Sequence, residues 1–401
     1  MFAFVHGRWR IRRSRAEPSG STLTDSSSRR PGRARRGWIA LLVSLGASLA
    51  LAEVALRASV APERFLDPST DAYWHAAALS ASTGAAHEGR SERDIEVDPE
   101  LGWRMKPSFE RGDVHHDARG FRRTSSRVAT EAGTAKSTRI LAIGDSFTYG
   151  LGVADPDTYA SQLALATDSD VINAGVNGYG VDQALLLWER EGAALAPDVV
   201  VLGIYVDDVY RIGLSMREAP KPHFVRGADG GWLPKPVAPA RAPNAEASRS
   251  IFASSRVVGA LASGLRRVER KLGRVDETKL RQLEELDEYL LARLRDSVVA
   301  ANARLLVVFI GHEYDGQPDH AWIEASVVRT CRKLGVECLN LAEERRHVGG
   351  TSWYGSNGHF GAEGHRAAAT AIGRVLGLMH GIAPEQRVEH GTVSLPPEAG
   401  R

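Results

Sequence analysis

The chain has 401 residues, of which 43% are hydrophobic and 25% are charged, a composition typical of globular proteins. It excludes a wholly disordered chain and a polytopic membrane protein. Ten arginines and two acids give residues 1–37 a charge of +8, so the remainder carries −6 within a total of +2. A mildly acidic body argues against nucleic acid as a partner.

An apolar segment follows the arginine-rich residues and is uncharged from Gly37 to Ala52. At about 1.5 Å per residue it can cross a hydrocarbon core of about 30 Å, so we predict a single-pass transmembrane anchor over residues 38–57. Arginines favour the cytoplasmic side, which makes residues 1–37 a cytoplasmic tail and places the body in the periplasm or at the cell surface. Ala50-Leu-Ala52 also fits a cleavage site, so a removed signal sequence is the alternative.

The remainder divides by composition. Residues 58–136 form a polar extracytoplasmic approach segment, and short apolar runs then alternate with helical stretches over residues 137–380, as in a parallel βαβ sheet. The predicted strands are Ile140–Ile143, Val171–Ile172, Val199–Tyr205, Leu305–Ile310 and Val336–Leu341. The predicted helices are Thr158–Ala166, Val181–Ala196, Lys279–Ala301, Ala321–Leu334 and Ala362–Leu376. A proline-rich insertion loop interrupts the alternation at residues 213–247, and residues 381–401 form a C-terminal tail.

Several residues are assigned to packing. A row of apolar residues recurs at helical spacing and predicts a core-facing stripe: Leu280, Leu283, Leu286, Leu290, Leu294 and Val298. Asp208 is expected to anchor its loop, and His365 to pack in the last helix. Cys331 and Cys338 either form a disulfide or remain as two buried thiols.

Polar residues that suit acyl transfer follow three predicted strands. Ile143-Gly-Asp-Ser146 leads from the first strand towards a helical stretch, where a serine hydroxyl is presented at the sheet edge. Asn173-Ala-Gly-Val-Asn-Gly178 follows the second strand and offers backbone donors, and Asp207-Asp208 follows the third. Asn357-Gly-His359 places an imidazole on a loop before the last helix. A hydroxyl, backbone donors and an imidazole are what acyl transfer needs.

These four segments, in this order, resemble the SGNH or GDSL hydrolase superfamily over roughly Arg139–Gly377. The anchor and the approach segment resemble those of membrane-anchored bacterial members. The resemblance implies a three-layer, flavodoxin-like α/β fold with a central parallel sheet, and no metal or cofactor. It also implies Ser146 as nucleophile, His359 as general base, and an oxyanion hole that contains the N–H groups of Ser146 and Gly178.

Two positions depart from the family pattern. Asp207 stands where the family carries an asparagine whose amide donates to the oxyanion, and a carboxyl group can donate there only when it is protonated. Asn357 stands near the position of the family's aspartate, and a neutral amide that accepts from the His359 Nδ1–H stabilises an imidazolium less well than a carboxylate does.

The sequence therefore predicts an extracytoplasmic serine esterase that removes or transfers small, acetyl-like O-acyl groups, with an acyl ester or an acylated glycan as substrate. Because of Asp207 and Asn357, the alternative is a catalytically impaired pseudoenzyme that binds acylated glycans at the exported face of the membrane.

Overall fold

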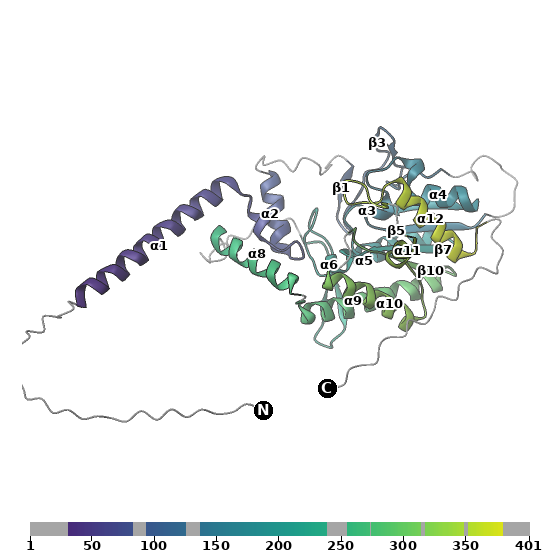
Figure 1. Cartoon of the computed structure of the whole chain (residues 1–401). Coiled ribbons are helices and arrows are strands. Elements are labelled where there is room, and N and C mark those ends of the chain that lie inside the picture. The colour runs from purple at the N-terminus through teal and green to yellow at the C-terminus, as the bar shows by residue number, and fades with distance from the viewer. Residues whose placement is uncertain are drawn as a thin grey trace, which may run out of the picture. The chain divides into compact units, whose positions relative to one another are not determined.

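The computed structural model describes residues 31–82, 94–125, 137–238, 255–272, 274–313, 317–348 and 352–379 (Figure 1). Residues 1–30 of the predicted cytoplasmic tail (1–37) and the whole predicted C-terminal tail (381–401) lie outside these ranges, while residues 31–37 belong to the first helix. The chain divides into two compact units, Met1–Val54 and Ala55–Arg401.

Helix α1 (Pro31–Ser59) contains the predicted membrane segment. Its stretch Arg36–Ser59 is long and apolar enough to cross a bilayer, and none of its most apolar part is buried against described residues. Large apolar side chains such as Trp38 and Leu42 are about two-thirds exposed, at 66% and 65%. The structure thus contains one candidate membrane span, by length and composition.

The second unit is built on a five-stranded parallel sheet. Its strands are β5 (Arg139–Gly144), β6 (Asp170–Gly175), β7 (Val199–Tyr205), β10 (Arg304–Ile310) and β11 (Glu337–Asn340). The spatial order is β6-β5-β7-β10-β11, which is 2-1-3-4-5 along the chain and confirms the flavodoxin-like prediction. The short apolar runs of the sequence form these strands because both faces of a parallel sheet are covered.

Helices cover both faces of this sheet, so the predicted three-layer architecture is confirmed (Figure 1). On one face α4 (Tyr159–Thr167) packs against α12 (Ala362–Leu376), and on the other α9 (Glu277–Ala300) packs against α10 (Pro318–Leu334). The predicted leucine stripe of α9 is buried along its whole length.

The remaining helical elements are short, apart from α2 and α8. They are η1 (Pro62–Phe65), α2 (Asp71–Ser82), α3 (Ser146–Tyr149), η3 (Asp155–Asp157), α5 (Val181–Leu187), the π-turn η4 (Trp188–Gly192), η5 (Ala193–Leu195), α6 (Asp208–Arg211), α8 (Arg256–Lys271) and α11 (Leu341–Val348). The predicted helix Val181–Ala196 is therefore divided into three parts, and α8 has no counterpart among the predicted helices.

Three antiparallel strand pairs modify what the sequence suggested. Part of the predicted insertion loop forms the antiparallel pair β8 (His223–Arg226) and β9 (Trp232–Lys235), while residues 239–247 lie outside the described ranges. The approach segment forms the pairs β1 (Ile95–Asp98) with β2 (Gly102–Met105) and β3 (Glu110–Arg111) with β4 (Val114–His115).

The β1–β2 hairpin packs directly on the loop that follows β6. Leu101 and Trp103 are each 1% exposed and belong to the main hydrophobic core. The Tyr179 hydroxyl donates to the Trp103 carbonyl at 2.5 Å, and the Gln183 amide donates to the Leu101 carbonyl at 2.7 Å. Trp103 in turn donates from its indole to the Asn177 carbonyl at 2.8 Å. The approach segment is thus structurally part of the body that is built on the central sheet.

One acidic side chain in the core, that of Asp287, has no hydrogen-bond partner among the described residues. Both carboxyl oxygens of this residue, which lies on α9, are buried. Burial, with a smaller contribution from Glu284, raises the pKa of Asp287 from 3.8 to about 7. The neighbouring Cys331 thiol contacts Cys338, and this contact together with burial raises the pKa of Cys331.

We expect the change in the free energy of unfolding caused by Asp287→Asn to be more favourable at pH 8 than at pH 4. In the unfolded chain the Asp287 carboxyl ionises near its ordinary pKa, and in the folded protein it ionises only near pH 7. The free energy of unfolding of the native chain therefore falls as pH rises between these two values, by up to about 4 kcal/mol. Asparagine does not titrate, so its cost in the core is the same at both values. Urea unfolding of both chains at pH 4 and pH 8 measures the difference, and an equal difference at both would contradict the assignment.

Candidate active site

Ser146 lies at the tight turn that follows β5. Gly144 has a φ of +146°, and a methyl group there would lie 2.6 Å from the Gly203 carbonyl oxygen, so only glycine fits. The Asp145 side chain accepts from the Phe147 N–H at 2.9 Å and caps α3, which Ser146 begins. Since β5 lies between β6 and β7, the serine stands at the carboxyl end of the strand where the sheet order reverses.

The structure brings His359 to this serine across 213 positions of sequence. The Ser146 Oγ and the His359 Nε2 are 2.9 Å apart, and the His359 Nδ1 is 3.2 Å from the backbone carbonyl oxygen of Asn357. A carbonyl oxygen can only accept, so Nδ1 carries the ring proton and Nε2 presents its lone pair to the hydroxyl. This arrangement of serine and imidazole suits a nucleophile with its general base.

Asn357 supports the imidazole in a different way from the predicted one. Its side-chain oxygen accepts from the His359 N–H at 3.1 Å, and a methyl group at Gly152 would lie 2.3 Å from its Nδ2. The expectation that the side chain accepts from the imidazole is therefore wrong, and the backbone carbonyl makes that contact instead. The physical reason is the local turn, because an asparagine side chain readily bonds the backbone two residues on.

A buried ion-pair cluster joins the turns that follow three strands. The Arg211 Nη1 donates to the Asp145 Oδ2 at 2.9 Å and to the Tyr179 carbonyl at 2.9 Å, and it also pairs with Asp208. The other oxygen of Asp208 accepts from the Tyr205 N–H at 2.9 Å, which confirms that Asp208 anchors its loop. Burial and the adjacent Asp145 raise the pKa of Asp208. The cluster therefore fixes the serine turn relative to its neighbours.

The surroundings of His359 favour its neutral form. Burial is the largest cause that lowers its pKa below the usual 6.5, and the guanidinium groups of Arg211 and Arg217 lower it further, while Asp145 opposes them. The ring lies 4.9 Å from that of Phe147, which itself stacks on Tyr205 at 4.5 Å. An imidazole that stays neutral to lower pH can accept a proton over a wider range.

The predicted oxyanion residues lie at the ends of the neighbouring strands. Gly178, on the loop after β6, has a φ of +83°, and a methyl group there would lie 1.8 Å from the Arg217 Nη1. Asp207 lies two residues after the end of β7 and is half-buried, and its side chain makes no capping hydrogen bond to α6. Ser146, Gly178 and Asp207 thus share one edge of the sheet.

Arg217 is a residue of the site that the sequence analysis missed. Its guanidinium pairs with Glu218 at 2.9 Å and lies over the ring of Trp74, 4.8 Å from the ring centre. Arg217 lies in the predicted insertion and Trp74 in the approach segment, so no strand-end pattern marks either residue. The only sequence signal is a cation shortly after the Asp207-Asp208 pair.

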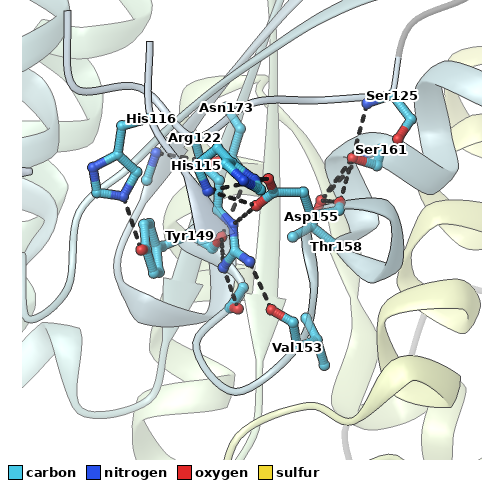
Figure 2. A network of polar contacts seen from close by, with 12 residues as sticks. His115, His116, Arg122, Ser125, Tyr149, Val153, Asp155, Thr158, Ser161 and Asn173 are labelled. Atoms are coloured by element: carbon cyan, nitrogen blue, oxygen red, sulfur yellow. Dashed lines mark hydrogen bonds and ion pairs between the residues drawn. The ribbon is translucent and has the colours of Figure 1, made fainter. Parts of the chain in front are cut away.

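A second buried arginine holds the loop behind the serine (Figure 2). The Arg122 side chain is fully buried and donates to the Asp155 carboxylate at 2.8 Å and to the carbonyls of Gly150 and Val153 at 2.6 Å each. Figure 2 also shows His115 on the same carboxylate, at 2.7 Å. Because Gly152 of this loop lies against Asn357, Arg122 helps to set the turn that carries the imidazole.

His365 takes the packing role expected of it. It is fully buried, and its Nδ1 accepts from the Tyr159 N–H at 3.1 Å. Burial lowers its pKa to about 3, so the ring is neutral at all working pH values.

Comparison with known proteins agrees with this fold. Residues 142–367 match the GDSL-like Lipase/Acylhydrolase family model. A search of curated proteins finds no match. Solved structures with a similar fold include TesA (14% identity, TM-score 0.37), which aligns over 60% of this chain and 98% of its own. LAE5, an alpha/beta hydrolase enzyme from the metagenome of Lake Arreo, aligns at 15% identity over 61% and 98%, with a TM-score of 0.38. Axe2, an acetylxylan esterase from Geobacillus stearothermophilus, aligns at 14% identity over 61% and 95%, with a TM-score of 0.36.

Proposed function

The chain belongs to the GDSL-like lipase/acylhydrolase family, and we propose that it is a serine esterase that removes or transfers small O-acyl groups outside the cytoplasm. The observation that carries the proposal is the 2.9 Å contact between the Ser146 Oγ and the His359 Nε2 at the carboxyl edge of the sheet. The contact joins a weak nucleophile to a neutral base, which is what formation of an acyl-enzyme requires.

The proposed reaction has two half-steps. The Ser146 Oγ attacks the ester carbonyl while the His359 Nε2 takes the hydroxyl proton, and the alkoxide leaves with that proton as the free alcohol. Water or a second alcohol then gives its proton to Nε2 and attacks the acyl carbonyl on Ser146. The bond between Oγ and the acyl group breaks, Nε2 returns the proton to Oγ, and the carboxylic acid or the new ester leaves. The Asn357 carbonyl stabilises the imidazolium in both half-steps by accepting from Nδ1–H.

The oxyanion would receive hydrogen bonds from the backbone N–H groups of Ser146 and Gly178. Asp207 can add a third only in its protonated form. The Arg217 cation beside Gly178 is well placed to offset negative charge that develops there. Arg217 and Glu218 also make this side of the site polar, which suits a polar alcohol such as a carbohydrate as the acyl carrier.

The location follows from α1, which we propose as a signal anchor. The arginine-rich residues before it would stay in the cytoplasm and the hydrolase body would lie outside. Cleavage after Ala52 would release the same body as a soluble protein on the same side of the membrane.

Trapping the acyl-enzyme tests the proposal. After brief incubation with p-nitrophenyl acetate and an acid quench, we expect the peptide that contains Ser146 to carry one acetyl group in the mass spectrum. Ser146→Ala is the matched control and should carry none. An unacetylated protein that does not turn over acyl esters but still binds acetylated glycans would overturn the proposal in favour of the binding-only alternative, which Asp207 suggests.

Arg217 gives a prediction on pH dependence. Its cation lowers the pKa of His359, so Arg217→Met should raise that pKa and move the acid limb of kcat/KM to higher pH. The plateau should also fall by up to ~10²-fold, because a charge near the oxyanion is lost. Arg217→Lys should retain the acid limb, since it keeps the charge.

Arg226→Met is the matched control for this measurement. Arg226 lies in the same insertion, on β8, and pairs with Glu285 on α9. An acid limb that moves equally in both variants, or in neither, would mean that Arg217 does not act on the imidazole.

A further inference from the structure

Helix α8 exposes a row of apolar side chains to solvent. The row consists of Val258, Leu261, Leu265, Val268 and, just beyond the helix, Leu272, which are 41%, 64%, 65%, 53% and 66% exposed. At 3.6 residues per turn these positions fall within about 80° of the helix circumference, so they form one continuous stripe. We call it the α8 stripe.

The other side of α8 is held by the residues that follow α1. A methyl group at Gly259 would lie 3.0 Å from the Phe65 Cβ. Arg266 donates to the Phe65 carbonyl at 2.6 Å, and Arg256 donates to the Val60 carbonyl at 3.1 Å. Gly259 and Arg266 lie about 130° around the helix from the middle of the stripe, so the stripe faces away from this contact.

This attachment places α8 close to the end of the candidate membrane span. Val60 is the residue after α1, and Phe65 follows only five residues later. Even a fully extended chain of six residues reaches about 20 Å, so α8 cannot move far from the point where α1 would leave the bilayer. The most extensive surface within that reach is the bilayer itself.

The charge of α8 fits an anionic bilayer surface. Its sixteen residues include five basic side chains and one acid, Glu269, which lies at the edge of the stripe. A helix with a narrow apolar face, a basic remainder and low overall hydrophobicity is typical of helices that lie in the plane of a membrane interface.

We propose that α8 is a second membrane contact, whose stripe inserts into the boundary between headgroups and acyl chains of a bilayer that contains anionic lipid. The proposal relies on α1 as an anchor and is independent of the acyl chemistry. It means that the hydrolase body keeps one face towards the membrane surface and does not rotate freely about the end of α1.

Site-directed fluorescence on the full chain tests this. The chain, with Cys331 and Cys338 replaced by alanine, is reconstituted in nanodiscs that contain phosphatidylglycerol and is labelled with an environment-sensitive dye at Leu265→Cys. The matched control is Arg267→Cys, an exposed position about 160° around the helix from Leu265. Insertion of 5–10 Å predicts a blue-shifted dye at 265 and quenching by nitroxide-labelled lipid about threefold or more stronger than at 267.

Three outcomes would overturn the proposal. Equal quenching at both positions would mean that the stripe does not enter the bilayer. A blue shift at 265 that grows with the number of chains per disc, without lipid quenching, would assign the stripe to a second copy of the chain. Quenching that is the same in purely zwitterionic discs would remove the role of anionic lipid. If the dye at 265 shows the stronger lipid quenching while Ser146 takes up no acetyl group, the membrane contact is supported and the esterase proposal is refuted.

Discussion

Replacing Ser146 with alanine, or His359 with alanine, is expected to lower kcat for an activated acyl ester by on the order of 10⁴–10⁶-fold. The hydroxyl is the group that would hold the acyl chain, and the His359 Nε2 contacts it at 2.9 Å, closer than the Asp145 Oδ2 at 3.3 Å. Because the two act as one unit, the double variant should be hardly slower than either single one. Burst and steady-state kinetics measure both effects.

Two other histidines serve as controls. His347→Ala removes an exposed ring on α11 whose Nδ1 bonds only its own helix, and it should leave kcat unchanged. His365→Asn should lower the melting temperature because the ring is fully buried, but the folded fraction should turn over normally. If His365→Asn were inactive while folded, and His359→Ala were active, the assignment of the base would be wrong.

Asp207→Asn is expected to raise kcat by up to ~10²–10³-fold, which is what one oxyanion donor is worth. An asparagine amide donates at every pH, whereas a carboxyl group donates only while protonated. The variant should therefore offer the oxyanion a donor that the carboxylate form of Asp207 lacks. Steady-state kcat of both chains on an activated acyl ester measures this.

The matched control is Asp157→Asn, which removes a half-buried carboxyl group on η3. It should leave kcat unchanged. If Asp207→Asn also leaves kcat unchanged, Asp207 does not face the oxyanion.

The sheet could be predicted because buried parallel strands appear in a sequence as short apolar runs. All five predicted runs are strands, and their carboxyl ends carry the segments that hold Ser146, Gly178 and Asp207. Helix α8 was not predicted although its exposed apolar residues recur at helical spacing. It follows the proline-rich insertion and lies outside the alternation of strands and helices on which the prediction relied.

Contacts made by backbone atoms or by distant segments could not be read from the sequence. The sequence indicates that Asn357 acts through its side-chain amide, whereas the structure shows that the local turn directs its backbone carbonyl towards the imidazole. Arg217 and Trp74 come from segments 143 positions apart along the chain, and their stacking depends on the packing of α2 beside the insertion. Likewise, the sequence does not show which carbonyls the Arg122 guanidinium reaches.

The β1–β2 hairpin has a practical consequence for anyone who wishes to excise the hydrolase. A fragment cut at the limits of the family match, residues 142–367, would lose part of β5 and with it Trp103, Leu101 and Arg122. The hydroxyl of Tyr179 and the amide of Gln183 would then face a bare cavity, and the Asp155 carboxylate would lose its buried cation. Such a fragment should be recovered from inclusion bodies. The shortest version that can be expressed in soluble form has to begin before Asp94, so sequence likeness and the unit of folding end at different places in this protein.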